Sequence, residues 1–301
     1  MQIVDELIQE VRDGLDEDTA SNITSGRIVR ALNRAARSLY NKVAKKLDSV
    51  FMKEYPFTAV GGTLVLPNDI YGQRVEFIEI LDGPVPRRLQ KLHLNQLRKY
   101  TSGIAASYSL KGNVVVFDSQ KTVTGTLYYM KRPAELTVSL GRVLDSTSST
   151  LTLDSVASSI TTDIDSLSAF INVIDQHTGE VKCSLQVADV DDDVIEIKTS
   201  SLDRVTVAGY TIATEVDANP DDYVAAISGS CIIEFLGDYS DYVVQHAVVE
   251  IRKSLGEQLD GEVALLRDYE KEILSMWAGR DQDKRIEAKN PHWQRTFRRS
   301  L

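Results

Sequence analysis

The hydrophobic pattern of residues 1–52 has a period close to four. Ile3, Leu7, Val11 and Leu15 recur at this spacing, and a longer run begins after a polar stretch at 16–22. In that run Ser25 or Thr24 can cap a helix. Its apolar positions are Ile28, Leu32, Ala35, Leu39, Val43 and Leu47. Because residues three or four apart share one helix face, residues 1–52 are predicted to form two helices arranged as a hairpin.

Between residues 55 and 133 the pattern changes to a period of two. The runs 57–60 and 64–66 flank Gly61-Gly62, which predicts a β hairpin. Further strands are expected at 75–80, 114–117 and 126–129, with a short helix at 89–100. We therefore expect residues 53–137 to form a β-rich section with antiparallel strands.

Residues 138–222 differ in kind, because they are rich in Ser, Thr, Asp, Val and Ile and show no helical stripe. Short alternating runs separated by turns are typical of strands. The expected strands are 151–153, 169–174, 180–186, 194–198, 204–207 and 210–213. This segment is interpreted as an inserted small all-β domain, either a barrel or a sandwich.

The helical period returns near the C-terminus. After a brief strand pattern at 231–234, helices are expected at 239–255 and 261–277, and Val263, Leu266, Ile273 and Trp277 mark the buried side of the second. We expect residues 223–279 to complete a helical body with the N-terminal helices, and residues 280–301 to form an extended basic and aromatic tail. The fold class expected for the whole chain is α+β.

The net charge of −10 is unevenly distributed along the chain. Residues 138–226 hold sixteen acids and four bases, whereas residues 280–301 hold seven bases and three acids. Opposite charges on one chain favour electrostatic contact between neighbouring copies or with a partner, and argue against a general nucleic-acid binder. A purely solubilising acidic surface is the alternative.

A basic stripe lies on the second predicted helix. Arg27, Arg30, Arg34 and Arg37 follow at spacings of three, four and three, which places them on one side of the helix. Such a stripe can face a neighbouring subunit, contact DNA phosphates or pair with carboxylates. The nearest acidic candidates in the sequence are Asp5, Glu6, Glu10 and Asp13 on the preceding helix.

The C-terminal tail has the composition of a segment that becomes ordered on a partner. Trp293 and Phe297 lie four residues apart, among Arg295, Arg298 and Arg299. Aromatic anchoring combined with charge pairing is typical of such segments. A tail that folds back on its own domain is the alternative.

Catalytic, metal and cofactor signatures are not found in the sequence, which has no phosphate loop, GxSxG, HExxH or CxxC motif. Asp189, Asp191, Asp192 and Asp193 lack the spacing of a calcium loop and indicate a solvated hairpin turn. His246 on an amphipathic helix is expected to be a core or interface residue. Acid pairs able to cleave glycosides stay open, because any carboxylate-rich chain can position two.

Membrane and redox signals are equally sparse. No long apolar run is present, and the first fifteen residues lack the pattern of a signal peptide, so no membrane segment is expected. Cys183 and Cys231 are the only cysteines, and they are interpreted as small buried hydrophobes.

Several segments resemble the head-to-tail adaptor proteins of short-tailed bacteriophages, a family that includes tail tubular protein A and related connectors. The similar passages are the Arg-Ala-Leu-Asn-Arg-Ala-Ala helix within 27–44, Leu66-Pro67-Asn68-Asp69 leading into a strand at 74–76, the strand pair in 108–137, and the helix start at 235–247. The resemblance covers residues 1–137 and 223–301, and the acidic β segment between them is a departure from smaller members.

The resemblance implies a structural virion protein without catalytic activity or cofactor, located at the portal vertex between head and tail and made in the host cytoplasm. It implies a ring, commonly of twelve copies, that binds the portal protein and the tail tube or nozzle, with tail fibre proteins as further partners. Viral DNA would pass through the lumen without sequence-specific binding. Two other classes stay open: a peptidoglycan hydrolase of the virion, and a DNA-binding module that uses the arginine stripe.

Overall fold

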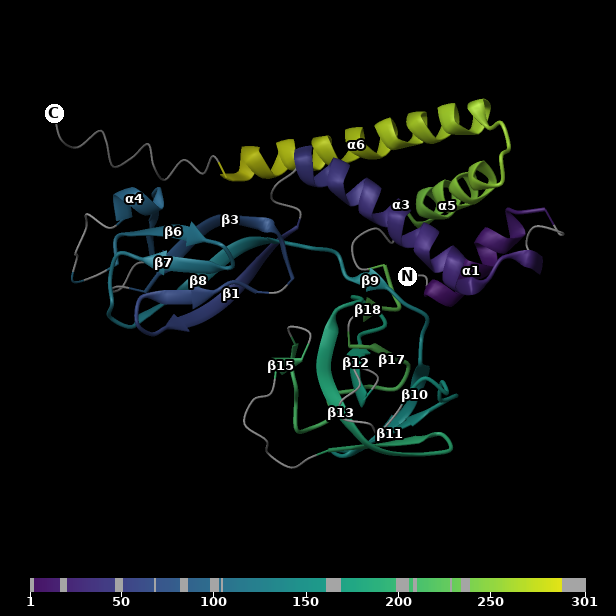
Figure 1. Ribbon diagram of the computed structural model, residues 1–301, viewed down its shortest axis with the longest axis horizontal. Helices are drawn as coiled ribbons and strands as arrows, with labels where there is room; N and C mark the ends of the chain where they lie inside the picture. Colours follow the sequence, from purple (N-terminus) through teal and green to yellow (C-terminus); the bar gives the residue numbers. More distant parts are fainter. Residues whose placement is uncertain are drawn as a thin grey trace. The chain divides into compact units, whose positions relative to one another are not determined.

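The computed structural model divides the chain into two compact units (Figure 1). Unit 1 comprises Met1–Leu47 with Ala134–Leu301, and unit 2 comprises Asp48–Pro133. The structure describes residues 3–16, 21–46, 51–67, 69–81, 86–97, 103, 105–160, 169–198, 206–207, 210–227, 229–233 and 239–288. Helices, sheets and a barrel occur together, which confirms the α+β class.

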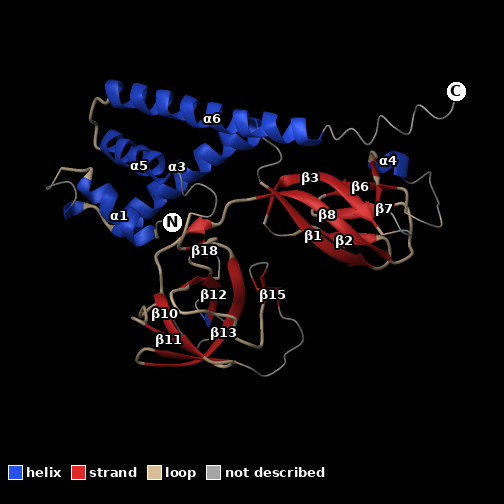
Figure 2. Ribbon diagram, turned by 180° about the vertical axis from the view of Figure 1, so that it is seen from behind, coloured by secondary structure: helices blue, strands red, loops and turns tan. Residues whose placement is uncertain are grey.

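In the described part of unit 1 the long elements at both ends of the sequence are helices (Figure 2). They are α1 (Val4–Asp13), α3 (Ser25–Lys46), α5 (Ser240–Ser254) and α6 (Asp260–Ala288). On α3 the predicted positions Ile28, Leu32, Ala35, Leu39 and Val43 have no exposed surface. Helix α3 packs along α5, α1 contacts both, and α6 contacts α3 and α5. Helices from both ends of the sequence therefore share hydrophobic contacts.

The last helix is longer than the sequence pattern predicts. A helix was expected at 261–277, but α6 continues to Ala288, so the expectation of an extended segment is wrong for residues 280–288. These residues are rich in Arg, Lys, Gln, Glu and Ala, which favour helix, and the first proline comes only at Pro291. Neither α6 nor any other helix in the described ranges is long and apolar enough to cross a membrane.

Six antiparallel strands close a barrel in unit 1. They are β10 (Gly141–Ser146), β11 (Thr150–Leu153), β12 (Phe170–Ile174), β13 (Val181–Asp191), β14 (Val194–Ile197) and β17 (Tyr223–Ala226), hydrogen-bonded in the order β10-β11-β14-β13-β12-β17. Their inward side chains fill the barrel, as a barrel of this size requires. Fully buried examples are Val143, Leu151, Leu153, Ile171, Val173, Leu185, Ile195 and Val224.

Two of the strands predicted for this segment lie outside the barrel. The runs at 204–207 and 210–213 contain only the short β15 (Thr206–Val207) and β16 (Tyr210–Thr211), which pair with each other. The barrel is closed instead by β10 and β17, which the sequence pattern missed. Strand β17 is short and shows no alternation, and β10 begins at Gly141, where φ is +152° and a Cβ atom would lie 2.2 Å from the Ser155 carbonyl oxygen. Their conformation depends on pairing with distant partners.

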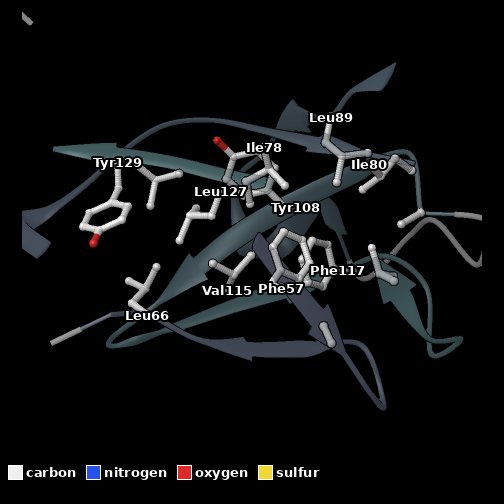
Figure 3. Close-up of a cluster of buried hydrophobic side chains, with 14 residues drawn as sticks. Phe57, Leu66, Ile78, Ile80, Leu89, Tyr108, Val115, Phe117, Leu127 and Tyr129 are labelled. Atoms are coloured by element: carbon white, nitrogen blue, oxygen red, sulfur yellow. The ribbon is translucent and has the colours of Figure 1, made fainter. Parts of the chain in front are cut away.

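Unit 2 is built from two four-stranded sheets around one core (Figure 3). The first sheet has the order β1 (Met52–Ala59), β8 (Val123–Lys131), β3 (Ile70–Ile80), β4 (Arg87–Arg88). The second has the order β2 (Thr63–Val65), β7 (Val114–Phe117), β6 (Ser107–Lys111), β5 (Gln90–Lys91). Phe57 of the first sheet stacks on Phe117 of the second with 5.8 Å between ring centroids, and Ile78, Leu127 and Val115 are fully buried beside them.

The hairpin predicted across Gly61 and Gly62 is wrong. Strand β1 pairs with β8 and β2 pairs with β7, so the two glycines carry the chain from one sheet to the other. Their φ angles are +71° and +74°, and a Cβ on Gly62 would lie 2.3 Å from the Ser119 carbonyl oxygen. Glycine therefore permits this corner, because other residues would be strained and would clash there.

The helix predicted at 89–100 is also largely wrong. Only Leu94–Leu97 form a helix, α4, and Gln90–Lys91 form β5, which pairs in parallel with β6. Residues 98–100 lie outside the described ranges. Pairing with a neighbouring strand has therefore overridden the local leucine spacing.

Candidate functional site: the arginine face of helix α3

Helix α3 carries its four arginines away from the buried stripe, and two of them contact α5. Arg27 donates a hydrogen bond from Nη2 to the Ser254 hydroxyl at 2.7 Å. The Nη1 atom of Arg34 lies 2.6 Å from Oε1 of Glu250. Because both partners belong to α5, half of the predicted stripe holds two helices of unit 1 together.

The carboxylates of α1, which the sequence suggested as partners, make other contacts. Asp5 accepts a hydrogen bond from the backbone N–H of Ser139 at 3.2 Å, and Glu6 accepts one from the backbone N–H of Ile3 at 3.3 Å. Helix α3 packs more extensively along α5 than along α1. The interpretation that α1 neutralises the stripe is therefore wrong for the two engaged arginines.

The other two arginines, Arg30 and Arg37, are exposed. Within the part of the chain that the structure describes, no hydrogen bond or ion pair involves either side chain. They are seven residues apart, which is two turns of helix or about 10 Å along its axis. We call these two residues the arginine pair.

A second polar cluster joins α3, α5 and α6. Lys42 of α3 forms an ion pair with Glu270 of α6, and the Tyr242 hydroxyl of α5 donates to the same carboxylate at 3.5 Å. Burial, assisted by the charge of Glu270, raises the pKa of Tyr242 to about 12. Burial lowers the pKa of His246, whose Nδ1 has no hydrogen-bond partner in the described residues. His246 is thus a neutral ring near a helix interface at physiological pH.

A short stem connects the barrel to the helices. It consists of β9 (Glu135–Leu136) and β18 (Gly229–Ser230), which pair in parallel. Asn33 of α3 donates to the Leu136 carbonyl at 2.9 Å and accepts from the Leu136 N–H at 2.7 Å. A side-chain amide that both donates to and accepts from one backbone residue fixes the orientation of that residue, so Asn33 anchors the stem to α3. Sequence reasoning missed this role, since its only signal was one amide within an arginine-rich helix.

The acidic segment singled out in the sequence lies at the turn between β13 and β14. Asp189, Asp191, Asp192 and Asp193 are all exposed, and Asp192 has a φ angle of +48°, as residues of tight turns often do. Among the described residues, no group of three or more His, Cys, Asp or Glu side chains could hold a metal ion. The segment is thus the hairpin turn that its sequence indicates.

Both cysteines are buried, as the sequence suggested. Burial raises the pKa of Cys183 to about 11 and that of Cys231 to about 12. Since the thiolate is the reactive form, both side chains behave as small hydrophobes at neutral pH.

The tail residues Trp293, Arg295, Phe297, Arg298 and Arg299 lie outside the described residues. Their predicted role in portal binding therefore stays a prediction.

The sequence matches the model of a known family over half of the chain. The model of the SU10 adaptor protein family matches residues 3–154, which extend from α1 through unit 2 to the first two strands of the barrel. The β segment at 138–222, which the sequence suggested as a departure from the family, is therefore partly included in the match, because β10 and β11 lie within it. The resemblance noted for 223–301 falls outside it and stays a prediction, and no curated protein matches the chain. On the evidence of this match, the chain belongs to the SU10 adaptor protein family, a family of phage head-tail adaptors.

Proposed function

We propose that the chain forms the head-to-tail adaptor ring of a short-tailed phage. The ring, of about twelve copies, docks below the portal, extends the DNA channel and provides the attachment surface for the tail tube or nozzle. The family match over residues 3–154 carries this proposal, because it makes the chain a structural phage adaptor protein. The copy number, the portal and tail partners and the position at the portal vertex are the parts that go beyond the match.

The charge of the chain supports a role beside moving DNA. Residues 138–226 have a net charge of −12, from sixteen acids and four bases. An excess of acids over free cations would repel phosphates, whereas many free arginines would hold the DNA through counterion release. Two of the four arginines of α3 already bind α5, which leaves few cations on this face for DNA.

In this proposal the barrel supplies contacts to tail proteins, and the stem holds it on the ring. Asn33 and the β9–β18 pair join the barrel to α3. Replacing residues 140–227 by a short Gly-Ser linker removes the barrel and keeps both stem strands. We expect the variant to bind portal rings and to fail at the next assembly step, measured by electron microscopy of particles. Complete tails in particles with this variant would contradict the role of the barrel.

The C-terminal tail is proposed to anchor each copy in a cleft on or between portal subunits. Trp293 and Phe297 would insert there, with Arg295, Arg298 and Arg299 pairing with acids. One buried aromatic anchor contributes roughly 2 kcal/mol or more, and copies in a ring add by avidity.

A truncation after Ala288 tests the anchor, because it removes residues 289–301 and keeps the whole of α6. We expect this variant to lose binding to purified portal rings in light scattering. The double variant Trp293→Ala/Phe297→Ala should lose most binding while keeping the tail charge. Unchanged binding by the truncated chain would refute the anchor.

A further inference from the structure

The β13–β14 hairpin carries exposed acids, and the nearest cation in the sequence, Lys198 at its end, forms no ion pair with them within the described residues. Asp189, Asp191, Asp192, Asp193 and Glu196 are exposed, and no Lys, Arg or His occurs between Cys183 and Ile197. Within the described ranges none of the five acids forms an ion pair. We call these five residues the acidic hairpin.

Two of the five acids oppose each other directly. Asp189 of β13 is the cross-strand partner of Glu196 of β14. Directly opposed residues of antiparallel strands have Cβ atoms about 5 Å apart, and like charges in this position destabilise the pair. A cationic partner would relieve this repulsion, and within the described residues no Lys, Arg or His of the same chain forms an ion pair with Asp189 or Glu196.

The acidic hairpin lies far from the arginine pair along the same unit. Strand β13 begins at Val181, which packs with Ile174, Cys231 and Ile232 next to the stem. It then runs for eleven residues to Asp191, a distance of about 30 Å. The arginine pair flanks Asn33, which binds the stem itself. The hairpin of one copy therefore points away from α3 of the same copy.

We propose that the acidic hairpin of one copy binds the arginine pair of α3 on a second copy. The inference deepens the proposed function, on which it rests, by naming a contact between ring neighbours. Every chain carries one acidic and one basic patch, of opposite sign and at separate places. Two different patches that complement each other form a heterologous interface, which generates closed rings when the rotation allows. The contact assigns functions to Arg30 and Arg37 that the helix packing leaves open.

Charge reversal on each side, and then on both sides, tests the contact with the full chain. Arg30→Glu/Arg37→Glu and Asp189→Lys/Glu196→Lys should each weaken self-association about tenfold or more in sedimentation at low salt. All four substitutions in one chain should restore it. Self-association of the wild-type chain should also weaken as salt is raised. A wild-type chain that stays monomeric, or a quadruple variant that does not recover, would overturn the proposal.

Controls separate this contact from a general charge effect. Lys91→Glu/Lys111→Glu changes the net charge by the same amount on exposed positions of unit 2 and should leave self-association unchanged. If the charge-reversed α3 is unstable, the neutral variant Arg30→Gln/Arg37→Gln tests the same contact by its self-association. Circular dichroism melts check that each variant is folded. An equal loss of self-association in the unit 2 control would refute the contact. It would also be refuted if the α3 variants lost DNA or portal binding but still self-associated, because the arginines would then have another role.

The same variants distinguish this inference from the adaptor role. Charge rescue without any binding to portal rings would keep the contact and reject the proposed function. If the chain binds portal rings and its self-association is unchanged by substitutions in either patch, the proposed function stands and the contact is rejected.

Discussion

The barrel of unit 1 and the paired sheets of unit 2 are both built from short strands, but their charges are opposite. The segment with the barrel, residues 138–226, has sixteen acids and four bases, whereas residues 48–133 of unit 2 have seven acids and eleven bases. Unit 2 uses several charges internally. Lys53 pairs with Asp69, Arg74 with Glu76, and the Arg88 guanidinium lies 4.0 Å from the Phe77 ring centroid.

The barrel differs because the acids of its outer hairpin form no ion pair within the described residues. A strongly enclosed cation of the barrel, Lys182, pairs with Asp222 at 2.8 Å, where the exposed fractions of the side chains are 16% and 1%. Buried side chains and internal ion pairs therefore explain the stability of the barrel and of unit 2, whereas exposed charges without ion-pair partners indicate where other molecules bind.

Core truncation should give the largest effect in both bodies. Leu185 in the barrel and Leu127 in unit 2 have no exposed surface. Leu185→Ala and Leu127→Ala should each lower the free energy of unfolding by roughly 3–5 kcal/mol, since each leaves a cavity. Hydrogen exchange should show the loss mainly in the body that carries the substitution. Equal loss of protection in both bodies would contradict their separation.

Removing the buried cation of the barrel should cost nearly as much. Lys182→Met leaves Asp222 almost fully buried without its counter-charge, which should destabilise unit 1 by roughly 3 kcal/mol. The matched change in unit 2 is Lys53→Met, where the side chains of the ion pair are 51% and 32% exposed. It should cost less than about 1 kcal/mol. Denaturant titrations measure both, and similar costs would contradict this distinction.

Buried hydrogen-bond networks should have an intermediate effect. In unit 2, Asp118 accepts bonds from Ala106 N, Ser107 N and the Ser107 hydroxyl at 2.9, 3.1 and 2.8 Å. In the barrel, Asn172 donates to the Ile227 carbonyl at 3.1 Å and accepts from the Ser184 hydroxyl at 2.7 Å. Asp118→Ala and Asn172→Ala should each cost roughly 2 kcal/mol, because donors are left unpaired. Thermal melts with unchanged midpoints would argue against these networks.

Acid should have the smallest effect, which is expected at Asp175 of the barrel segment. The Thr178 backbone N–H, helped by the His177 N–H, the Thr178 hydroxyl and Lys182, lowers the pKa of Asp175 from 3.8 to about 2. Its contribution to stability is therefore present above pH 3.8 and is lost as the pH falls through about 2. The stability difference between wild type and Asp175→Asn, followed by denaturant melts, should shrink between pH 4 and pH 2. A constant difference over this range would show that the charge is not responsible.

The sequence predicts the positions of α1, α3 and α5 well because their signal is local, whereas it misses the end of α6 and most of the segment at 89–100. The stripe of α3 is contiguous along one helix face, and its buried positions match those expected. Strand positions were also largely predictable, as for Val114–Phe117. Their partners were not, because β1 pairs with β8 some seventy residues later and not with the adjacent β2. Sheet pairing at this separation is decided by burial of the whole core.

The candidate site was only partly predictable for the same reason. Helical spacing places Arg27, Arg30, Arg34 and Arg37 on one face, but the split between engaged and free arginines depends on α5, which follows some two hundred residues later. Asn33 could not be recognised without the position of Leu136. Contacts between distant segments assign these roles.

The most direct test of the adaptor role is the mass of the complex between this chain and portal rings of the same phage, measured by light scattering. The chain has a mass of 33.5 kDa, so a bound ring should add about twelve times this value. A mass equal to that of the portal ring alone, at chain concentrations well above the portal concentration, would contradict the account.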